Sequence, residues 1–285
     1  MTKQNNIPNI GNKTFNKITQ VQNLFNDLIQ ERSPVGRPPN LNLSDVAVIL
    51  MIQNQYGNQN LKKLYNELRD HYNTYFQLPC YKNFVLTLRR RTVELIGIVP
   101  EICKYYSLAG IKFIDSTPLP VCKIWREKSH KVMKLLARKS KSTTGWYHGL
   151  KLHLVSDKNG NPVFFRITTA TVDDRIILAK AVSKTSNSIF IADAGYLNQQ
   201  YQKIAIKRSN FIITPCRFNM KMLSTFWQNE LMNMRSIIES VFSSLKTHYQ
   251  LTSTLSRSIN GYLSNYFRAI FRYCFRNIGN YDLIS

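Results

Sequence analysis

The sequence predicts a mixed α/β domain preceded by an all-helical region. In the first 100 of the 285 residues, apolar side chains recur at helical spacing between short breaks. From Leu108 onward, short apolar runs of strand type alternate with turn signals. A helical pattern between two of these runs, and another from Leu231 onward, complete the mixture of elements that defines an α/β domain. We therefore predict a helical region over residues 1–104 and an α/β domain over residues 105–285.

Four helices are expected in the first region. The spacing of apolar residues predicts one helix within residues 1–30, and the three prolines and one glycine of residues 33–39 interrupt it. Ser44 has the character of an N-cap for a second helix that runs to Tyr56. Two further helices are predicted over residues 61–75 and 81–96. We interpret this region as a DNA-binding and assembly region.

Strands begin after Leu108. Ile111–Ile114 is a short apolar run that ends at Asp115, and Pro118 and Pro120 are expected to stop the regular structure there. Residues 147–155 alternate as a strand, and the turn sequence that follows leads into another strand over residues 162–168.

The remaining elements mix helices with strands. Asp173 or Asp174 is expected to cap a helix that ends at Val182. Strands are predicted over residues 188–192 and 211–214, and the chain is read as helical from Leu231 onward.

Charge indicates a polyanionic partner. The chain has 39 Lys and Arg against 16 Asp and Glu, a formal net charge of +23, which favours nucleic acid. The longest apolar run, Val46–Ile52, is too short to cross a bilayer, and the first residues contain no signal core. Five scattered cysteines without a CxxC pair are typical of reduced thiols. We expect a cytoplasmic, nucleoid-associated protein without a membrane partner.

Three carboxylates stand out in this basic chain: Asp115, Asp193 and Glu239. Each aspartate follows a strand-type run, and the carboxyl ends of strands are where sites collect in open α/β sheets. Carboxylate oxygens suit hard divalent cations such as Mg²⁺, and two such ions can clamp a phosphoryl displacement. The alternative is that each aspartate only begins a turn. If the three are ligands, their carboxyl groups should converge within about 4 to 8 Å.

Glu239 lies in a helical pattern whose apolar stripe is Ile238, Val241, Phe242 and Leu245. At about 100° per residue, Arg235, Glu239 and Lys246 fall together on the flank of that stripe. From there a carboxylate can reach a packed sheet, while the two cations meet phosphate. The alternative is an ordinary ion pair between Arg235 and Glu239, four residues apart.

Two basic segments are candidates for DNA contact. A run between residues 123 and 141 holds eight cations and one acid, close to Trp125 and Trp146, so that phosphate contacts and stacking are both expected. The alternative is a solvated loop. The second segment is a triple arginine on the predicted helix 81–96. The predicted DNA-contacting residues are Lys123, Arg126, Lys128, Lys131, Lys134, Arg138, Lys139, Lys141, Arg89, Arg90 and Arg91, with Arg235 and Lys246 at the scissile phosphate.

The order of several motifs resembles that of a group of bacterial transposases, the insertion sequence 982 family of DDE transposases. The resemblance is close from about residue 105 to the end, and covers the first third by length and character only. The motifs are Ile-Asp115-Ser-Thr, Gly145-Trp-Tyr-His-Gly-Leu-Lys-Leu-His153, Thr-Val-Asp-Asp-Arg175, Asp193-Ala-Gly-Tyr196, Arg217-Phe-Asn-Met-Lys221, and Ile-Glu239 followed by Leu-Lys246.

This resemblance implies a ribonuclease-H-like catalytic fold with Asp115 on the first strand, Asp193 on the fourth and Glu239 on a later helix. It implies two Mg²⁺ or Mn²⁺ ions held by these carboxylates. It also implies cleavage at transposon ends, strand transfer into target DNA, and inverted-repeat ends as partners. We expect a homodimer on DNA. One departure is Ala194, which stands where the family pattern Asp-Lys-Gly-Tyr has lysine.

Two alternatives remain open at this point. One is a ribonuclease-H-like nuclease that hydrolyses DNA but does not join strands. The other is a non-catalytic DNA-binding descendant of such an enzyme, and the three intact carboxylates argue against it.

Overall fold

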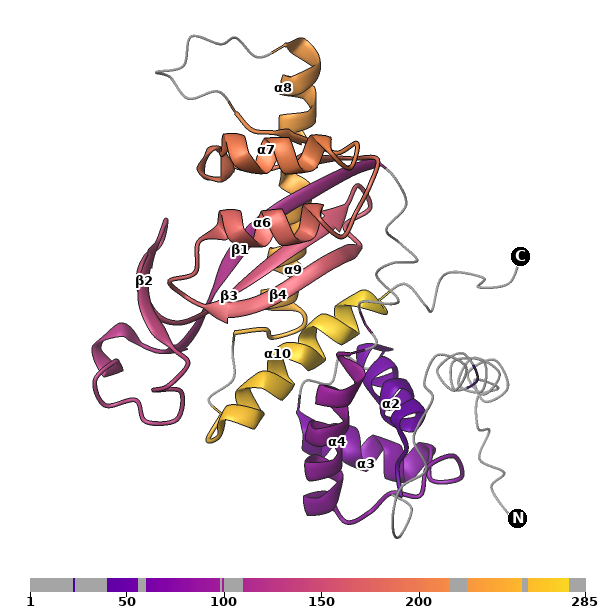
Figure 1. The fold of residues 1–285 in the computed structure, drawn as a ribbon. Coiled ribbons are helices and arrows are strands. Elements are labelled where there is room, and N and C mark those ends of the chain that lie inside the picture. Colours follow the sequence, from indigo (N-terminus) through magenta and orange to yellow (C-terminus); the bar gives the residue numbers. More distant parts are fainter. Residues whose placement is uncertain are drawn as a thin grey trace, which may run out of the picture. The chain divides into compact units, whose positions relative to one another are not determined.

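The computed structural model describes residues 40–55, 60–97, 110–215, 225–252 and 256–276, together with residues 23 and 99 (Figure 1). Contacts divide the chain into two units, Met1–Ile98 with Phe271–Ser285, and Val99–Ile270. Several expectations lie outside the described residues: the helix within residues 1–30, the proline-rich break, the motif at residues 217–221 and the boundary between residues 104 and 105.

The first unit contains three described N-terminal helices, as the sequence predicts: α2 (Leu43–Gln55), α3 (Leu61–His71) and α4 (Tyr81–Leu95). The prediction that Ser44 caps α2 is wrong. Asn42 accepts from the Asp45 amide at 2.7 Å, and Asp45 accepts from the Asn42 amide at 3.0 Å, so this reciprocal pair begins the helix. The Ser44 hydroxyl donates to the same Asn42 side chain at 2.7 Å.

Buried apolar residues hold these helices together. α2 is buried along most of its length, and α3 and α4 contribute Leu64, Leu68, Phe84 and Leu88. The end of α10 (Ile259–Cys274) belongs to the same unit. There the Arg272 guanidinium donates to the Asn54 side chain at 2.8 Å, and the Asn54 amide donates to the Arg272 carbonyl at 2.8 Å.

The second unit is built on a six-stranded sheet. β3 (Gly145–Asp157) pairs antiparallel with β1 (Gly110–Cys122) on one side. On its other side β3 pairs with β2 (Arg138–Ser142) and then β4 (Pro162–Thr169). β5 (Ser188–Ile191) runs parallel to β1, and β6 (Phe211–Ile213) runs parallel to β5. The predicted mixed α/β fold class, a mixed sheet flanked by helices and preceded by helices, is confirmed.

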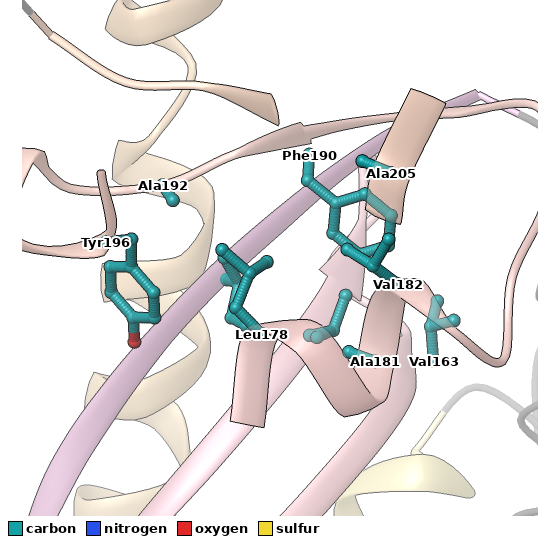
Figure 2. Packing of buried hydrophobic residues seen from close by; sticks show 10 residues of the cluster. Val163, Leu178, Ala181, Val182, Phe190, Ala192, Tyr196 and Ala205 are labelled. Carbon is teal, nitrogen blue, oxygen red and sulfur yellow. The ribbon is translucent and has the colours of Figure 1, made fainter. Parts of the chain in front are cut away.

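Helices cover both faces of this sheet. α6 (Asp174–Val182) and α7 (Gln199–Ile206) lie on one face, and α9 (Ser236–Thr247) lies behind β1 on the other (Figure 1). The α6 side is closed by a buried cluster in which Ile114 of β1 meets Leu178 of α6 and Phe190 of β5 (Figure 2). Residues of β1 with even numbers near Ile114 therefore face α6, and those with odd numbers face α9.

Strand β1 is longer than the sequence predicts, because Pro118 and Pro120 do not end it. The β5 register stops at the pair Phe113–Ile191, and from there on no described strand pairs with that edge of β1. Pro118 and Pro120 are two residues apart, so their ring nitrogens point to the same edge of β1, the one that β5 no longer covers. A proline has no N–H to donate, and on that edge no hydrogen bond to a neighbouring described strand is lost. The β3 ladder continues on the other side as far as Cys122.

Other elements were not predicted. β2 lies inside the basic run, α7 follows Asp193, and the helical end of the chain is divided into α8 (Phe226–Asn233), α9 and α10. In the described part of the chain, no helix combines the length and the apolar character needed to cross a membrane.

Candidate functional site

Asp115 lies on β1, and Asp193 follows the end of β5, the parallel neighbour of β1. In the parallel pairing of β1 with β5, Phe113 lies opposite Ile191. The same register continued by two residues places Asp193 opposite Asp115. Asp193 follows the end of β5 and caps the short 3₁₀ helix η2 (Ala194–Tyr196), since its carboxylate accepts from the Ala194 amide at 2.7 Å. The strand pairing itself therefore brings these two carboxylates together.

Both carboxylates converge on one cation, Arg235, the residue that precedes α9. Its Nη2 lies 3.6 Å from Asp115 Oδ2, and its Nη1 lies 3.5 Å from Asp193 Oδ1. The Arg235 and Asp115 side chains are 19% and 26% exposed, whereas that of Asp193 is 57% exposed. The pair is thus half-buried at Asp115 and open to solvent through Asp193.

The surroundings of Asp115 disfavour the ionised form of its carboxyl group. Burial raises the pKa of its carboxyl, and repulsion from Asp193 and Asp174 adds to the rise. The amide of Ser116, which donates to Asp115 at 2.7 Å, and the Arg235 guanidinium act in the opposite direction. Burial also lowers the pKa of Lys246 on α9, and the attraction of Asp115 opposes this. A carboxylate of this kind gains from any additional cation that reaches it.

The structure does not bring Glu239 into contact with this pair. α9 packs with the predicted stripe of Ile238, Val241, Phe242 and Leu245 buried, but Glu239 is exposed. Arg235 directs its guanidinium to the two aspartates, so the predicted ion-pair alternative does not describe it. The expected convergence of all three carboxylates is not observed. Like charges repel, and Arg235 compensates only two of them.

The donor set described at this site consists of two carboxylates, Asp115 and Asp193. Among the described residues, no group of three or more His, Cys, Asp and Glu is placed to hold a metal. Asp115 and Asp193 nevertheless offer carboxylate oxygens to one shared positive group, the Arg235 guanidinium. Mg²⁺ is commonly held by one or two carboxylates together with substrate phosphate, and this pair fits that chemistry.

The eight cations between residues 123 and 141 are all exposed. Part of this run is not a loop, because Arg138, Lys139 and Lys141 lie on β2, paired with β3. Trp125 and Trp146 are 73% and 58% exposed. Lys123 Nζ lies 4.9 Å from the Trp125 ring centroid, and Lys139 Nζ lies 5.4 Å from that of Trp146. The segment presents cations and ring faces to solvent on an ordered framework.

The triple arginine of α4 is only partly available. Arg89 and Arg90 are exposed, whereas the Arg91 side chain is 14% exposed and pairs with Glu94 at 2.6 Å. Arg90 also approaches Glu94, at 3.4 Å. Two of the three side chains therefore face solvent.

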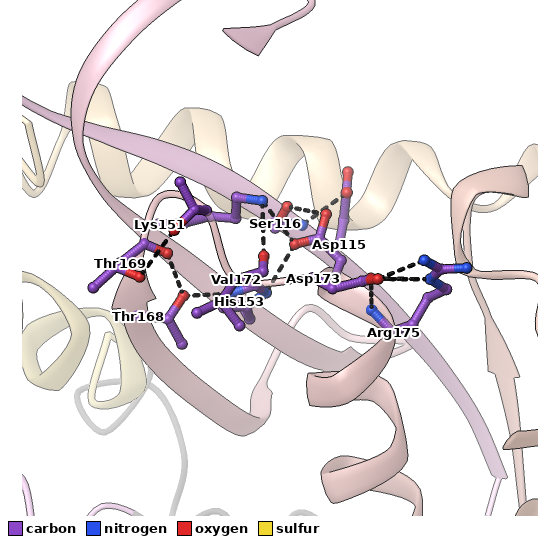
Figure 3. A network of polar contacts seen from close by, with 11 residues as sticks. Asp115, Ser116, Lys151, His153, Thr168, Thr169, Val172, Asp173 and Arg175 are labelled. Atoms are coloured by element: carbon purple, nitrogen blue, oxygen red, sulfur yellow. Dashed lines mark hydrogen bonds and ion pairs between the residues drawn. The ribbon is translucent and has the colours of Figure 1, made fainter. Parts of the chain in front are cut away.

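A polar network behind Asp115 was not predicted as part of the site (Figure 3). Asp173, not Asp174, caps α6, and it also pairs with Arg175. Asp174 instead accepts from the Ser116 hydroxyl at 3.1 Å and from Lys151 Nζ at 3.0 Å, and lies 3.3 Å from His153 Nδ1. All of these residues lie in the sequence motifs that resemble the transposase family. Those motifs were the sequence signal that could have indicated the network.

The fold and the paired aspartates define a mixed α/β protein with an acidic site where its parallel strand pairing ends. Residues 106–259, more than half of the chain, match the family described as transposase DDE domain. The chain therefore belongs to this family. No match was found among curated proteins.

Two solved transposase structures resemble the chain. One is a piggyBac transposase synaptic complex with hairpin DNA, at 11% identity and a TM-score of 0.46, covering 94% of this chain and 72% of that one. The other is a Mos1 transposase paired-end complex with the left transposon end, at 13% identity and a TM-score of 0.25, covering 97% and 90%.

Proposed function

We propose that this protein is a DNA transposase of the insertion sequence 982 type. It cleaves phosphodiester bonds at the ends of its element and transfers the exposed 3′-hydroxyl strands into target DNA. One observation carries the proposal: Asp115 and Asp193 lie side by side at the edge of two parallel strands and converge on one cation. Membership of the transposase DDE domain family supports it.

Asp115 and Asp193 would hold Mg²⁺ or Mn²⁺, with Glu239 as the third carboxylate of a two-ion site. When bound, such ions neutralise the charge of the scissile phosphate and lower the pKa of the attacking water. In this proposal Glu239 would join the pair by a rotamer change. Arg235, which precedes α9, and Lys246 of α9 both interact with Asp115, and at about 100° per residue Glu239 lies on the same flank of the helix.

Arg235 has two roles in this proposal. Without substrate it compensates the two aspartates, and its own Nε is buried without a hydrogen-bond partner among the residues that the structure describes. Once other cations compensate the carboxylates, the guanidinium is released to donate to the scissile phosphate. Lys246, on the same side of α9, supplies a second positive charge there.

DNA is the partner that the charge favours. The eight exposed cations between residues 123 and 141, with Arg89 and Arg90 on α4, offer phosphate contacts. We propose that the N-terminal helices bind the inverted-repeat ends and that a homodimer joins two ends, one active site acting on each.

The test is a cleavage and joining assay with the full chain, Mg²⁺ or Mn²⁺, and labelled DNA carrying the repeats that flank the gene. A transposase nicks at the repeat ends and joins them to a target plasmid, and Asp115→Asn does neither. Cleavage without joined products would support the nuclease alternative. Binding without cleavage would support the non-catalytic descendant and contradict the proposal.

A further inference from the structure

The polar network around Asp174 lies on the opposite face of the sheet from Asp115. Ser116 faces α6, as Ile114 does, while Asp115 faces α9. Ser116 pairs directly with His153 across the β1–β3 ladder, so both side chains point to the same face. Lys151 lies two residues from His153 on β3 and shares that face. Asp174 enters from the first turn of α6.

Ser116 connects the two faces. Its backbone amide donates to Asp115 Oδ1 at 2.7 Å, and its hydroxyl donates to Asp174 Oδ2 at 3.1 Å. The connection falls where β1 has lost a neighbour, because the β5 register ends at Phe113. From there, among the described strands, β1 pairs with β3 alone. The contact between Ser116 and Asp174 ties this segment to α6 instead.

Two side chains of β3, Lys151 and His153, lie next to the Asp174 carboxylate. Lys151 Nζ lies 3.0 Å from Asp174 Oδ1, and its side chain is only 17% exposed. His153, 1% exposed, lies 3.3 Å from the same oxygen, and its Nε2 lies 2.8 Å from Thr168 Oγ1. Burial lowers the pKa of His153 to about 4, so the imidazole is neutral and Lys151 is the charged partner. Figure 3 shows the polar contacts of Ser116, Lys151 and His153 in this network as dashed lines.

We propose that Asp174 is a positioning residue that, through Ser116, fixes the orientation in which Asp115 meets its cation. This inference rests on the proposed function, in which Asp115 is a metal ligand. Asp174, held by Lys151, contacts the strand that carries the ligand through Ser116. Groups that orient ligands from behind typically change metal affinity or activity about 10- to 100-fold when they are removed.

The experiment compares Ser116→Ala and Asp174→Asn in the full chain. Ser116→Ala removes only the connecting hydroxyl, so a variant that folds is available even if Asp174→Asn unfolds. Asp173→Asn is the matched control: it removes the neighbouring carboxylate of the same helix start, which caps α6 and does not contact Ser116. Mn²⁺ binding is measured by the loss of free Mn²⁺ signal in paramagnetic resonance. Cleavage of labelled end DNA is measured alongside.

Ser116→Ala and Asp174→Asn are expected to weaken Mn²⁺ binding about 10- to 100-fold and to lower the cleavage rate at saturating DNA, with the Km for DNA unchanged. The double variant should bind Mn²⁺ no more weakly than Asp174→Asn, because both residues act through one contact. Asp173→Asn should bind Mn²⁺ within about twofold of the unaltered chain, since it leaves that contact in place. Ser116→Ala and Asp174→Asn should each leave the affinity for DNA unchanged.

Other results would overturn the inference. Normal Mn²⁺ binding and cleavage by Ser116→Ala, with only a lower melting temperature for Asp174→Asn, would make Asp174 an anchor of α6 and nothing more. If the unaltered chain binds Mn²⁺ through Asp115 but does not cleave DNA, the proposed function fails. The Mn²⁺ affinities of the variants then decide by themselves whether Asp174 positions Asp115. If the unaltered chain does not bind Mn²⁺ through Asp115, both fail.

Discussion

The two faces of β1 differ in what they leave open. On the α6 face, Asp174 contacts both Ser116 and His153, and the buried cluster that includes Ile114 packs this face against α6. On the α9 face, Phe113, Thr117 and Leu119 are buried, but Asp193 and Glu239 are exposed, and Arg235 Nε has no hydrogen-bond partner among the described residues. Both faces hold the strand in place, but near Asp115 the α9 face also offers charge that a cation or phosphate can reach; we call it the open face and the α6 face the closed face. Substitutions on the closed face should therefore act on stability and geometry, and those on the open face on chemistry.

The largest effect is expected on the open face. Asp115→Ala, Asp193→Ala and Glu239→Ala should each reduce DNA cleavage by more than about a thousandfold, because ligands of one metal site act as a unit. A double substitution should be no worse than a single one. DNA affinity, measured by fluorescence anisotropy, should be unchanged or tighter, since a negative charge is lost near phosphate.

Glu230→Ala is the control, because this residue is an exposed acid of α8. Retention of more than a few per cent of activity by any one of the three would remove that residue from the site. Glu239 is the sharpest case, since the structure does not join it to the pair.

A core substitution on the closed face should show the opposite behaviour. Leu178→Ala deletes a fully buried side chain of α6 that packs on the sheet. It should lower the free energy of unfolding by about 2 to 5 kcal/mol, as large-to-small changes in cores do. Ile176→Ala on the same helix, where the side chain is 43% exposed, should cost far less. Equal losses in urea denaturation would contradict the assignment of the buried face.

The exposed basic run extends the comparison to a third surface. Replacing Lys128, Lys131 and Lys134 by Ala should weaken binding to all DNA sequences alike and flatten the log–log salt slope by about 3, at roughly 0.9 per phosphate contact. The triple control Lys158→Ala, Lys180→Ala and Lys203→Ala changes the charge equally at exposed positions elsewhere. The same slope for both triple variants would mean that the run makes no specific contribution.

Arg235 tests whether the open face holds a replaceable cation. Arg235→Gln removes the charge that the two carboxylates share, so Mn²⁺ should bind the DNA-free protein about tenfold more tightly, equivalent to about 1.4 kcal/mol. Cleavage should fall nonetheless, because the phosphate contact is lost. Calorimetric titration with Mn²⁺ measures the first effect, and Arg257→Gln, an exposed arginine, serves as control. Weaker Mn²⁺ binding by Arg235→Gln would show that the guanidinium does not compete.

The smallest effect concerns pH on the closed face. The pKa of His153 is about 4 in the folded protein against 6.5 ordinarily, so the unfolded chain binds more protons between these values. Stability is then fullest above pH 6.5 and falls as the pH drops toward 4. His153→Gln should make the melting temperature less dependent on pH across this range. His71→Gln, at an exposed position, should not. Parallel curves for His153→Gln and the unaltered chain would contradict the argument.

The sequence by itself determined much of this protein. Hydrophobic spacing located the helices of the first unit, the strands around Asp115 and Asp193, and the buried stripe of α9. The excess of Lys and Arg indicated a polyanionic partner. These features depend on local spacing and on counts of charge, which a single chain displays without folding.

Tertiary structure alone decided the rest. Pro118 and Pro120 stay within β1 because β5 ends before them, a fact of strand pairing that no local propensity contains. Arg235 turns to the two aspartates, and Asp174 turns to Ser116, because parallel register and helix packing bring distant segments together. Long-range contacts determine which charged side chains meet. The network behind Asp115 forms because the fold brings β1, β3 and α6 together.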